Sequence, residues 1–174
     1  ADVVGSLPGA LKALGLEVSI GLPLYRVVRQ EGFSVTPVLH GLEVPLGTGT
    51  LACNVWAGET AEGVPAYFFE REDLFDRPHL YGTPAGDYYD NLERFAFFCR
   101  AALLFARNTG LRMNVLHCHD WQTGLVPAYL RTLYREDPFF SETSCVFTIH
   151  NIGYQGLFPG EKFPLCGIPV SQYH

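Results

Sequence analysis

Two neighbouring stretches decide the fold class: MNVLHCHDWQTGLVPAYLRTLYRE (residues 113–136) and TSCVFTIHN (residues 143–151). The first opens with an apolar strand pattern and continues with a helical one, and the second is again an apolar strand. A strand, a helix and a strand at this spacing form a crossover unit, whose strands are parallel. The sequence therefore predicts an α/β fold, a Rossmann-like parallel sheet with flanking helices.

The N-terminal part of the chain has the pattern of a further helix and strand. Residues 2–14 carry apolar side chains at helical spacing, with Asp2 suited to the N-cap and Gly15 to the C-terminal cap. Pro8 predicts a kinked or irregular first part of this helix, because proline lacks the backbone N–H. Residues 16–23 have the pattern of a short buried strand.

The middle of the chain predicts hairpins, a loop and a long helix. Residues 33–70 break into strand-like pieces cut by Gly, Pro and Thr, which indicates a strand-rich hairpin insertion. Residues 71–89, rich in Pro, Gly and Asp, predict a loop. The clearest helix spans residues 90–109, with Gly110 at its C-terminal cap. Its predicted apolar face consists of Leu92, Phe95, Ala96, Cys99, Ala102, Leu103 and Ala106.

The composition argues against two classes of protein. The formal net charge is −6 and the basic residues are scattered, so the chain offers no basic patch to a nucleic acid. No apolar stretch approaches the roughly 20 residues that cross a bilayer. The five cysteines are an odd number without a C-x-x-C pair, and we expect reduced thiols in a cytoplasmic compartment.

Both strands of the crossover unit end in polar side chains, at the edge where open parallel sheets bind ligands. The residue types leave three readings open. In the first, Asp120 caps the following helix and the histidines bond neighbouring backbone. In the second, four side chains bind zinc: His117, His119, Asp120 and His150. In the third, a polar organic ligand is bound by Asp120, His150 and Asn151.

The segment TIHNIGYQGLFPG (residues 148–160) adds to the third reading. A core strand gains nothing from ending in a histidine and an asparagine. Gly153 and Gly156 would let the backbone approach a ligand closely, because glycine has no Cβ. The alternative is an ordinary polar turn.

Four motifs together resemble, in the same order, those of the bacterial glycogen synthases and plant starch synthases: ADVVGSLPGALKALG (1–15), YYDNLERFAFFCRAAL (88–103), VLHCHDWQTGLVPAYL (115–130) and FTIHNIGYQGLFP (147–159). The resemblance implies a retaining glucosyltransferase with two Rossmann domains. Residues 1–174 would form a single, truncated N-terminal domain, without the family's first strand and Lys-x-Gly-Gly loop and without its C-terminal domain. The implied reaction transfers glucose from ADP-glucose to the non-reducing 4-OH of an α-1,4-glucan, with no metal or cofactor.

The same resemblance implies roles for individual residues. His150 would hold a hydroxyl of the transferred glucose, and Asp120 at the floor of the cleft would support catalysis or place the acceptor. Asn151, beside His150, would face the transferred glucose, and Tyr81 would lie near the sugar or the acceptor. Asp2 would lie near the donor nucleotide sugar.

The remaining expectations concern what this chain does by itself. His117 and His119 are expected to be packing or supporting residues. Because the family's cations for the diphosphate would lie outside residues 1–174, the chain alone should bind donor weakly and should not turn over. The alternative function is a non-catalytic α-glucan-binding or regulatory remnant of the same fold. The sequence leaves open ADP-glucose or UDP-glucose as donor, and the cytoplasm or a plastid as compartment.

Overall fold

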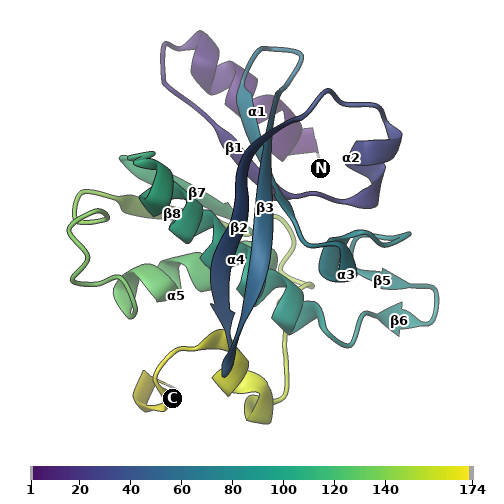
Figure 1. Cartoon of the computed structure of the whole chain (residues 1–174), viewed down its shortest axis with the longest axis vertical. Helices are drawn as coiled ribbons and strands as arrows, with labels where there is room; N and C mark the ends of the chain where they lie inside the picture. The colour runs from purple at the N-terminus through teal and green to yellow at the C-terminus, as the bar shows by residue number, and fades with distance from the viewer. Residues whose placement is uncertain (1, 173–174) are drawn as a thin grey trace. The chain divides into compact units, whose positions relative to one another are not determined.

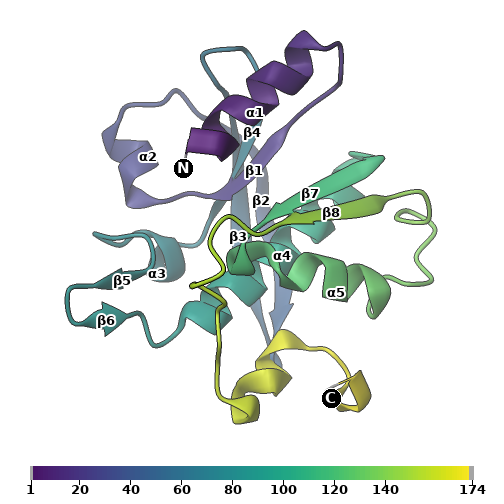
Figure 2. The ribbon, with the colours of Figure 1, turned by 180° about the vertical axis from the view of Figure 1, so that it is seen from behind.

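The computed structural model describes residues 2–172 (Figures 1 and 2). The chain divides into two compact units, of which the first comprises Ala1–Leu42 with Ala52–Leu80. The second comprises Glu43–Leu51 with Tyr81–His174. Each unit contains paired strands and helices of its own.

The first unit is built on a mixed four-stranded sheet of order β1-β4-β3-β2. Its strands are β1 (Ile20–Pro23), β2 (Thr36–Leu46), β3 (Gly49–Glu59) and β4 (Pro65–Glu70). β1 and β4 are parallel, whereas β3 and β4 are antiparallel. The helices are α1 (Asp2–Ala13), α2 (Arg26–Gln30) and α3 (Glu72–Phe75). The strand-rich insertion predicted over residues 33–70 is confirmed.

Polar side chains fasten the elements of the first unit to one another. Lys12, in the last turn of α1, donates a hydrogen bond from Nζ to the carbonyl of Gly63 at 2.6 Å. Glu70, at the end of β4, accepts hydrogen bonds from Asn54 Nδ2 at 2.9 Å and from Trp56 Nε1 at 3.0 Å. These bonds hold α1 to the turn before β4, and β4 to its neighbour β3.

The second unit contains the predicted crossover. Its parallel strands are β7 (Val115–His119) and β8 (Ser144–Thr148), and their register places His119 opposite Thr148. A short 3-10 helix, η1 (Trp121–Thr123), and the helix α5 (Leu125–Arg131) follow β7. The predicted strand–helix–strand unit with parallel strands is therefore confirmed. Figures 1 and 2 show α5 and the long helix α4 (Asn91–Thr109) beside this strand pair.

Helix α4 supplies most of the core of the second unit. Six of the seven residues predicted for its apolar face are buried, and the seventh, Ala102, is half-buried. Burial extends around the helix to further residues: Asn91, Arg94, Phe97, Phe98, Ala101 and Phe105. The helix ends at Gly110, whose φ of 72° requires the left-handed conformation that glycine adopts readily, as predicted.

Short elements complete the second unit. They are β5 (Gly82–Thr83), β6 (Gly86–Asp87) and the 3-10 helices η2 (Gly160–Cys166) and η3 (Val170–Gln172). The end of β2, the start of β3 and the turn between them (Glu43–Leu51) also belong to this unit, and Gly47 N in that turn donates a hydrogen bond to Leu165 O at 3.1 Å.

Helix α1 continues through Pro8, which removes one helix hydrogen bond, and the predicted kink or irregularity of its first turns stays a prediction. Two local predictions differ from the structure. The strand predicted over residues 16–23 is limited to β1, because the residues before it are mostly exposed. Residues 71–89 contain α3 and the small β5–β6 hairpin in place of an irregular loop.

No helix within residues 2–172 combines the length and the apolar character needed to span a membrane. The longest, α4, carries charged side chains along its length, among them Glu93, Arg94 and Arg100.

Candidate active site

The polar residues predicted at the two strand ends lie together in the second unit. His119 and Thr148 are register partners at the ends of β7 and β8. The chain that leaves each strand therefore passes the same edge of the pair. Asp120 follows one strand and His150 the other, and the two residues are in contact. The geometry brings together residues that are 30 positions apart.

Asp120 has a strained backbone and uses its side chain across the strand pair. Its φ of 57° and ψ of −177° lie in a region that residues other than glycine rarely occupy. Two hydrogen bonds hold it there: its N–H donates to Thr148 O at 2.9 Å, and its Oδ1 accepts the N–H of His150 at 2.7 Å. The side chain caps no helix N–H, so the reading of Asp120 as a side-chain helix cap is wrong.

The histidines form side-chain contacts, which corrects the reading that they bond neighbouring backbone. His119 Nδ1 and His150 Nε2 are hydrogen-bonded at 2.9 Å. His117 Nε2 is hydrogen-bonded to Thr148 Oγ1 at 2.7 Å. The rings of His117 and His119 are stacked, with centroids 4.2 Å apart. A row of three imidazoles therefore crosses the ends of β7 and β8.

The surroundings of His119 lower its pKa. Partial burial lowers the pKa of His119, and the nearby His117 and His150 lower it further, whereas the charge of Asp120 raises it. The net direction is down from the ordinary value of about 6.5. His119 is consequently a neutral imidazole at neutral pH, able to donate or accept one hydrogen bond through each nitrogen.

Tyr81 lies in the same unit, with its ring packed on aromatic side chains. Its centroid is 6.0 Å from that of Phe95 and 6.4 Å from that of Trp121. Burial raises the pKa of Tyr81, and the negative charge of Asp120 raises it further, against the opposing effect of Arg94. The phenol therefore stays protonated and can donate a hydrogen bond near Asp120.

A buried polar pair in the first turn of α4 holds the backbone of Tyr81. Asn91 Nδ2 donates to Tyr81 O at 2.8 Å, and Arg94 Nη1 donates to Asn91 Oδ1 at 2.7 Å. Asn91 is 1% exposed and Arg94 is fully buried. The Arg94 guanidinium also lies over the ring of Tyr88 at 5.1 Å. Sequence reasoning missed this pair, although an arginine among apolar residues of a buried helix was a signal for it.

Of the other two predicted substrate-binding residues, the structure describes the side chain of Asn151 only. Asn151 is exposed, and its Oδ1 accepts the N–H of Gly153 at 2.9 Å, so its side chain shapes the turn after β8. Asp2 begins α1 in the first unit, and its side chain lies outside the described part of the structure. Its proposed place near the donor stays a prediction.

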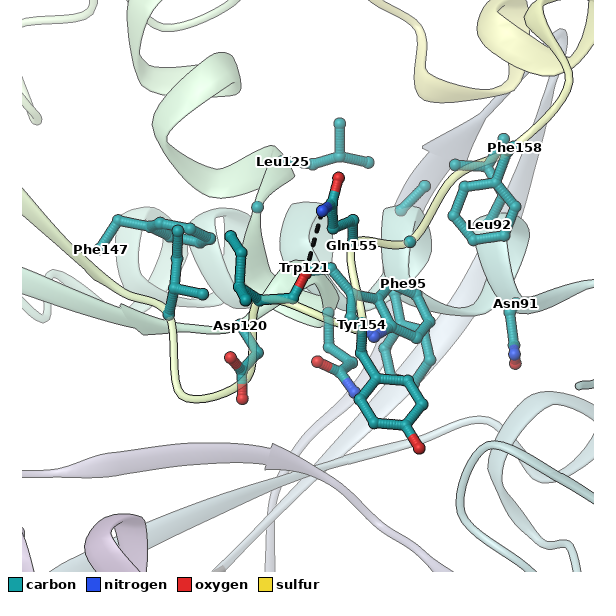
Figure 3. Close-up of a pocket in the computed structure, with 16 residues that line it drawn as sticks. Asn91, Leu92, Phe95, Asp120, Trp121, Leu125, Phe147, Tyr154, Gln155 and Phe158 are labelled. Atoms are coloured by element: carbon teal, nitrogen blue, oxygen red, sulfur yellow. Dashed lines mark hydrogen bonds between the residues drawn. The ribbon is translucent and has the colours of Figure 1, made fainter.

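A cavity of about 380 Å³ lies beside Asp120 (Figure 3). Aromatic and aliphatic side chains make up most of its wall, with Asp120 and a few amides as polar groups. Its lining comes from the start of α4, from η1 and the start of α5, and from β8 and the segment after it: Asn91, Leu92, Phe95, Ala96, Asp120, Trp121, Gln122, Gly124, Leu125, Phe147, Ile149, Ile152, Tyr154, Gln155, Gly156 and Phe158. An apolar cavity with few polar groups is typical of a small-molecule site.

Gly156 brings the segment after β8 against Trp121. Its φ is 61°, and a Cβ at this position would lie 2.6 Å from the Trp121 ring. The sequence predicted that the glycines of this segment let the backbone approach a ligand. In the structure, Gly156 instead lets the backbone pack closely against the indole ring of Trp121. Gln155 closes the same turn by donating from Nε2 to Ile152 O at 2.9 Å, the dashed bond in Figure 3.

Within residues 2–172, no group of three or more His, Cys, Asp or Glu side chains is placed to hold a metal ion. The geometry therefore gives the zinc reading no support. The five cysteines are free thiols and four of them are buried. Burial raises the pKa of both Cys53 and Cys99 to about 12, which keeps these thiols protonated and unreactive.

Comparison with known proteins identifies the family. A family model described as the starch synthase catalytic domain matches residues 1–174. The chain belongs to this family. The resemblance drawn from the four sequence motifs is therefore confirmed.

Individual members of the starch synthase catalytic-domain family are similar over almost the whole chain. The glycogen synthase of Koribacter versatilis is 48% identical over 169 residues, which are 97% of this chain and 34% of the relative. The glycogen synthase of Syntrophotalea carbinolica is 46% identical over 99% of this chain and 36% of the relative. The chain thus spans about a third of the length of these relatives.

A solved structure of the family shares the fold. The catalytic domain of starch synthase IV from Arabidopsis thaliana, bound to ADP and acarbose, matches with a TM-score of 0.84 and 29% identity. The match covers 98% of this chain and 34% of that structure. The predicted fold class, an α/β fold with parallel strands and flanking helices, is confirmed by this match.

Proposed function

We propose that this chain is part of a retaining glucosyltransferase that transfers glucose from ADP-glucose to the non-reducing 4-OH of an α-1,4-glucan. The observation that carries the proposal is the 48% identity to a glycogen synthase over 97% of the chain. The ADP and acarbose bound to starch synthase IV support a nucleotide diphosphate and a saccharide as ligands. UDP-glucose is the competing donor.

The contacts at the strand ends support the roles proposed for individual residues. His150 holds a hydroxyl of the transferred glucose. Asp120 fixes His150 through its backbone N–H and lines the cavity, where it orients the acceptor. The protonated phenol of Tyr81 and the exposed side chain of Asn151 contribute further hydrogen bonds to the sugars.

The charges near the site support a division of labour with the rest of a longer protein. Breaking the bond between glucose and phosphate places negative charge on the leaving diphosphate, which preorganised cations stabilise. Arg94, whose charge acts on Tyr81, is fully buried and hydrogen-bonded to Asn91. We therefore assign the sugar side of the site to this chain, an N-terminal Rossmann-like domain. The diphosphate side belongs to sequence that the relatives have outside the matched third.

We further propose that the reaction needs no metal ion or organic cofactor. The donor's own diphosphate is the leaving group, and hydrogen bonds and cations of the protein are sufficient to stabilise it. Five free thiols support a reducing compartment, the cytoplasm or, in a plant, the plastid.

The test uses the longest polypeptide that contains this chain. Labelled ADP-glucose and, separately, labelled UDP-glucose are supplied with a glycogen primer, and the label in polymer is counted for wild type, His150→Ala and His40→Ala. His40 is an exposed histidine of β2 in the first unit and serves as the matched control. We expect incorporation from ADP-glucose that is lost in His150→Ala and kept in His40→Ala. A folded protein that binds glucan but incorporates label from neither donor would instead be a glucan-binding module.

A further inference from the structure

One of the two ring nitrogens of His150 is already used inside the protein. Its Nε2 is hydrogen-bonded to His119 Nδ1 at 2.9 Å, and the two rings lie 5.2 Å apart at an interplanar angle of 20°. A neutral imidazole has one N–H donor and one lone-pair acceptor, on different nitrogens. Once Nε2 is bonded to His119, the nitrogen of His150 that remains for a ligand is Nδ1.

His150 is held at two points, which fixes more than its place in the chain. Asp120 Oδ1 accepts its backbone N–H at 2.7 Å, and His119 bonds its ring. The backbone bond sets where the residue lies, whereas the ring bond sets the side-chain rotation. A ring fixed in both respects can present one chosen nitrogen to a sugar hydroxyl without an ordering cost at the moment of binding.

We infer that His119 is a positioning residue, which holds the ring of His150 so that Nδ1 of His150 meets the transferred sugar. The inference rests on the proposed function, in which His150 contacts that sugar. When His119 donates the proton of the shared bond, His150 offers its Nδ1–H as a donor. When His119 accepts it, His150 offers an Nδ1 lone pair. In either arrangement the same nitrogen faces the ligand.

The neighbouring His117 provides a matched comparison for this role. It projects from the same face of β7, two residues before His119, and its ring stacks on that of His119. Its hydrogen bond goes to Thr148 Oγ1 rather than to His150. Removing His117 therefore removes an imidazole from the same row and leaves the bond between His119 and His150 in place.

The chemistry of amide side chains makes the inference specific to one nitrogen. An asparagine amide occupies the place of a histidine Nδ1, whereas the longer glutamine amide reaches the place of Nε2. His119 bonds His150 through Nδ1. Asparagine at position 119 should therefore restore the bond, and glutamine should not.

The experiment measures kcat and KM for ADP-glucose and for glycogen in the longest polypeptide that contains this chain. His119→Ala should lower kcat about tenfold, the upper range for loss of one hydrogen bond, with little change in KM for glycogen. His119→Asn should recover most of the loss and His119→Gln should recover little. His117→Ala should stay within about threefold of wild type, since it keeps the bond to His150.

Two outcomes overturn the inference without touching the proposed function. In the first, Asn and Gln at position 119 give the same kcat, which means that the Nδ1 contact is irrelevant. In the second, His117→Ala and His119→Ala lose activity equally and in proportion to their loss of thermal stability, which means that both rings only pack. Failure of the proposed function has a separate signature: the folded wild-type protein incorporates label from neither donor. The asparagine–glutamine comparison applies even if the alanine variant folds poorly.

Discussion

At the scale of single residues, the sequence singled out Asp120 and His150 but not the contact between them. Their types and positions at strand ends were visible in the chain. Their pairing depends on the register of β7 against β8, which places His119 opposite Thr148 and which local patterns do not encode. The same register makes His119, which was expected to be a packing or supporting residue, the ring partner of His150.

Asp120 has a strained backbone, a side-chain hydrogen bond and a negative charge. Two substitutions distinguish the contribution of the hydrogen bond from that of the charge. Asp120→Asn keeps an oxygen for the His150 N–H, so its free energy of unfolding should stay close to that of wild type. Asp120→Ala keeps the strained backbone and loses the acceptor, which should lower the free energy of unfolding by about 1–2 kcal/mol. Urea unfolding measures both. If Asp120→Asn is also fully active, the catalytic assignment of the carboxylate is wrong.

His119 should make stability depend on pH in a known direction. Its pKa is lowered on folding, chiefly by burial, so the unfolded chain binds a proton at a pH where the folded chain does not. The contribution of neutral His119 to the free energy of unfolding is complete above the unfolded pKa of about 6.5. It is lost as the pH falls through that value toward the lower pKa of the folded state. Urea unfolding at several pH values should show a smaller acid loss in His119→Asn than in wild type. Equal losses in the two proteins would show that His119 is not responsible.

At the scale of elements, helix α4 was predictable in position and only partly in environment. Its bounds and its C-terminal glycine followed from the periodicity of apolar side chains. Its burial around nearly the whole circumference did not, because a single apolar stripe cannot reveal how many neighbours cover a helix. Arg94 and Asn91 therefore turned out to be buried polar groups that hold the Tyr81 backbone.

The buried pair Asn91 and Arg94 in α4 should contribute to stability more than an exposed helix position does. Asn91→Ala removes the bond to the Tyr81 carbonyl and leaves buried Arg94 donors without that partner, which should cost about 1–3 kcal/mol of stability. Asn108→Ala, at an exposed position of the same helix, is the matched control. Chemical unfolding gives the cost, and limited proteolysis should find faster cleavage near Tyr81 in Asn91→Ala alone. Similar costs for both variants would contradict the role of the pair.

The segment after β8 depends on a glycine pressed against an indole. Gly156→Ala would combine a positive φ with a Cβ 2.6 Å from the Trp121 ring. Gly110→Ala shares the positive φ, but nothing lies within 4 Å of its Cβ, so it reports the backbone strain alone, about 1–2 kcal/mol. Circular dichroism in urea should show the larger loss for Gly156→Ala. A loss no greater than that of Gly110→Ala would mean that the segment shifts freely away from Trp121.

At the scale of the whole molecule, the crossover around β7 and β8 and the family were predictable, and the division into two units was not. Four motifs in the same order are specific for the family, because each pairs polar site residues or a helix pattern with a fixed position along the chain. The division of the chain reflects which segments pack on which core, and that is decided by contacts between distant parts of the sequence. The turn between β2 and β3, for example, joins the second unit through Gly47 and Leu165.

The chain alone should not synthesise glucan. It spans about a third of its relatives, and Arg94, the cation bonded beside Tyr81, is buried away from any diphosphate. The 174-residue chain and the longest polypeptide that contains it should be compared with labelled ADP-glucose and glycogen primer. We expect label in polymer from the longer protein only. Turnover by the 174-residue chain would show that the leaving diphosphate needs no cations other than those of this chain.

The chain has two tryptophans, and each compact unit contains one of them. Trp56 donates its indole N–H to Glu70 in the first unit, whereas Trp121 lines the cavity of the second. Intrinsic fluorescence therefore reports on the two units through separate chromophores. In Trp56→Phe, the remaining tryptophan emission comes from Trp121 in the cavity lining. Binding of a saccharide in the cavity should then be detected as quenching or a spectral shift of this emission, without an attached dye.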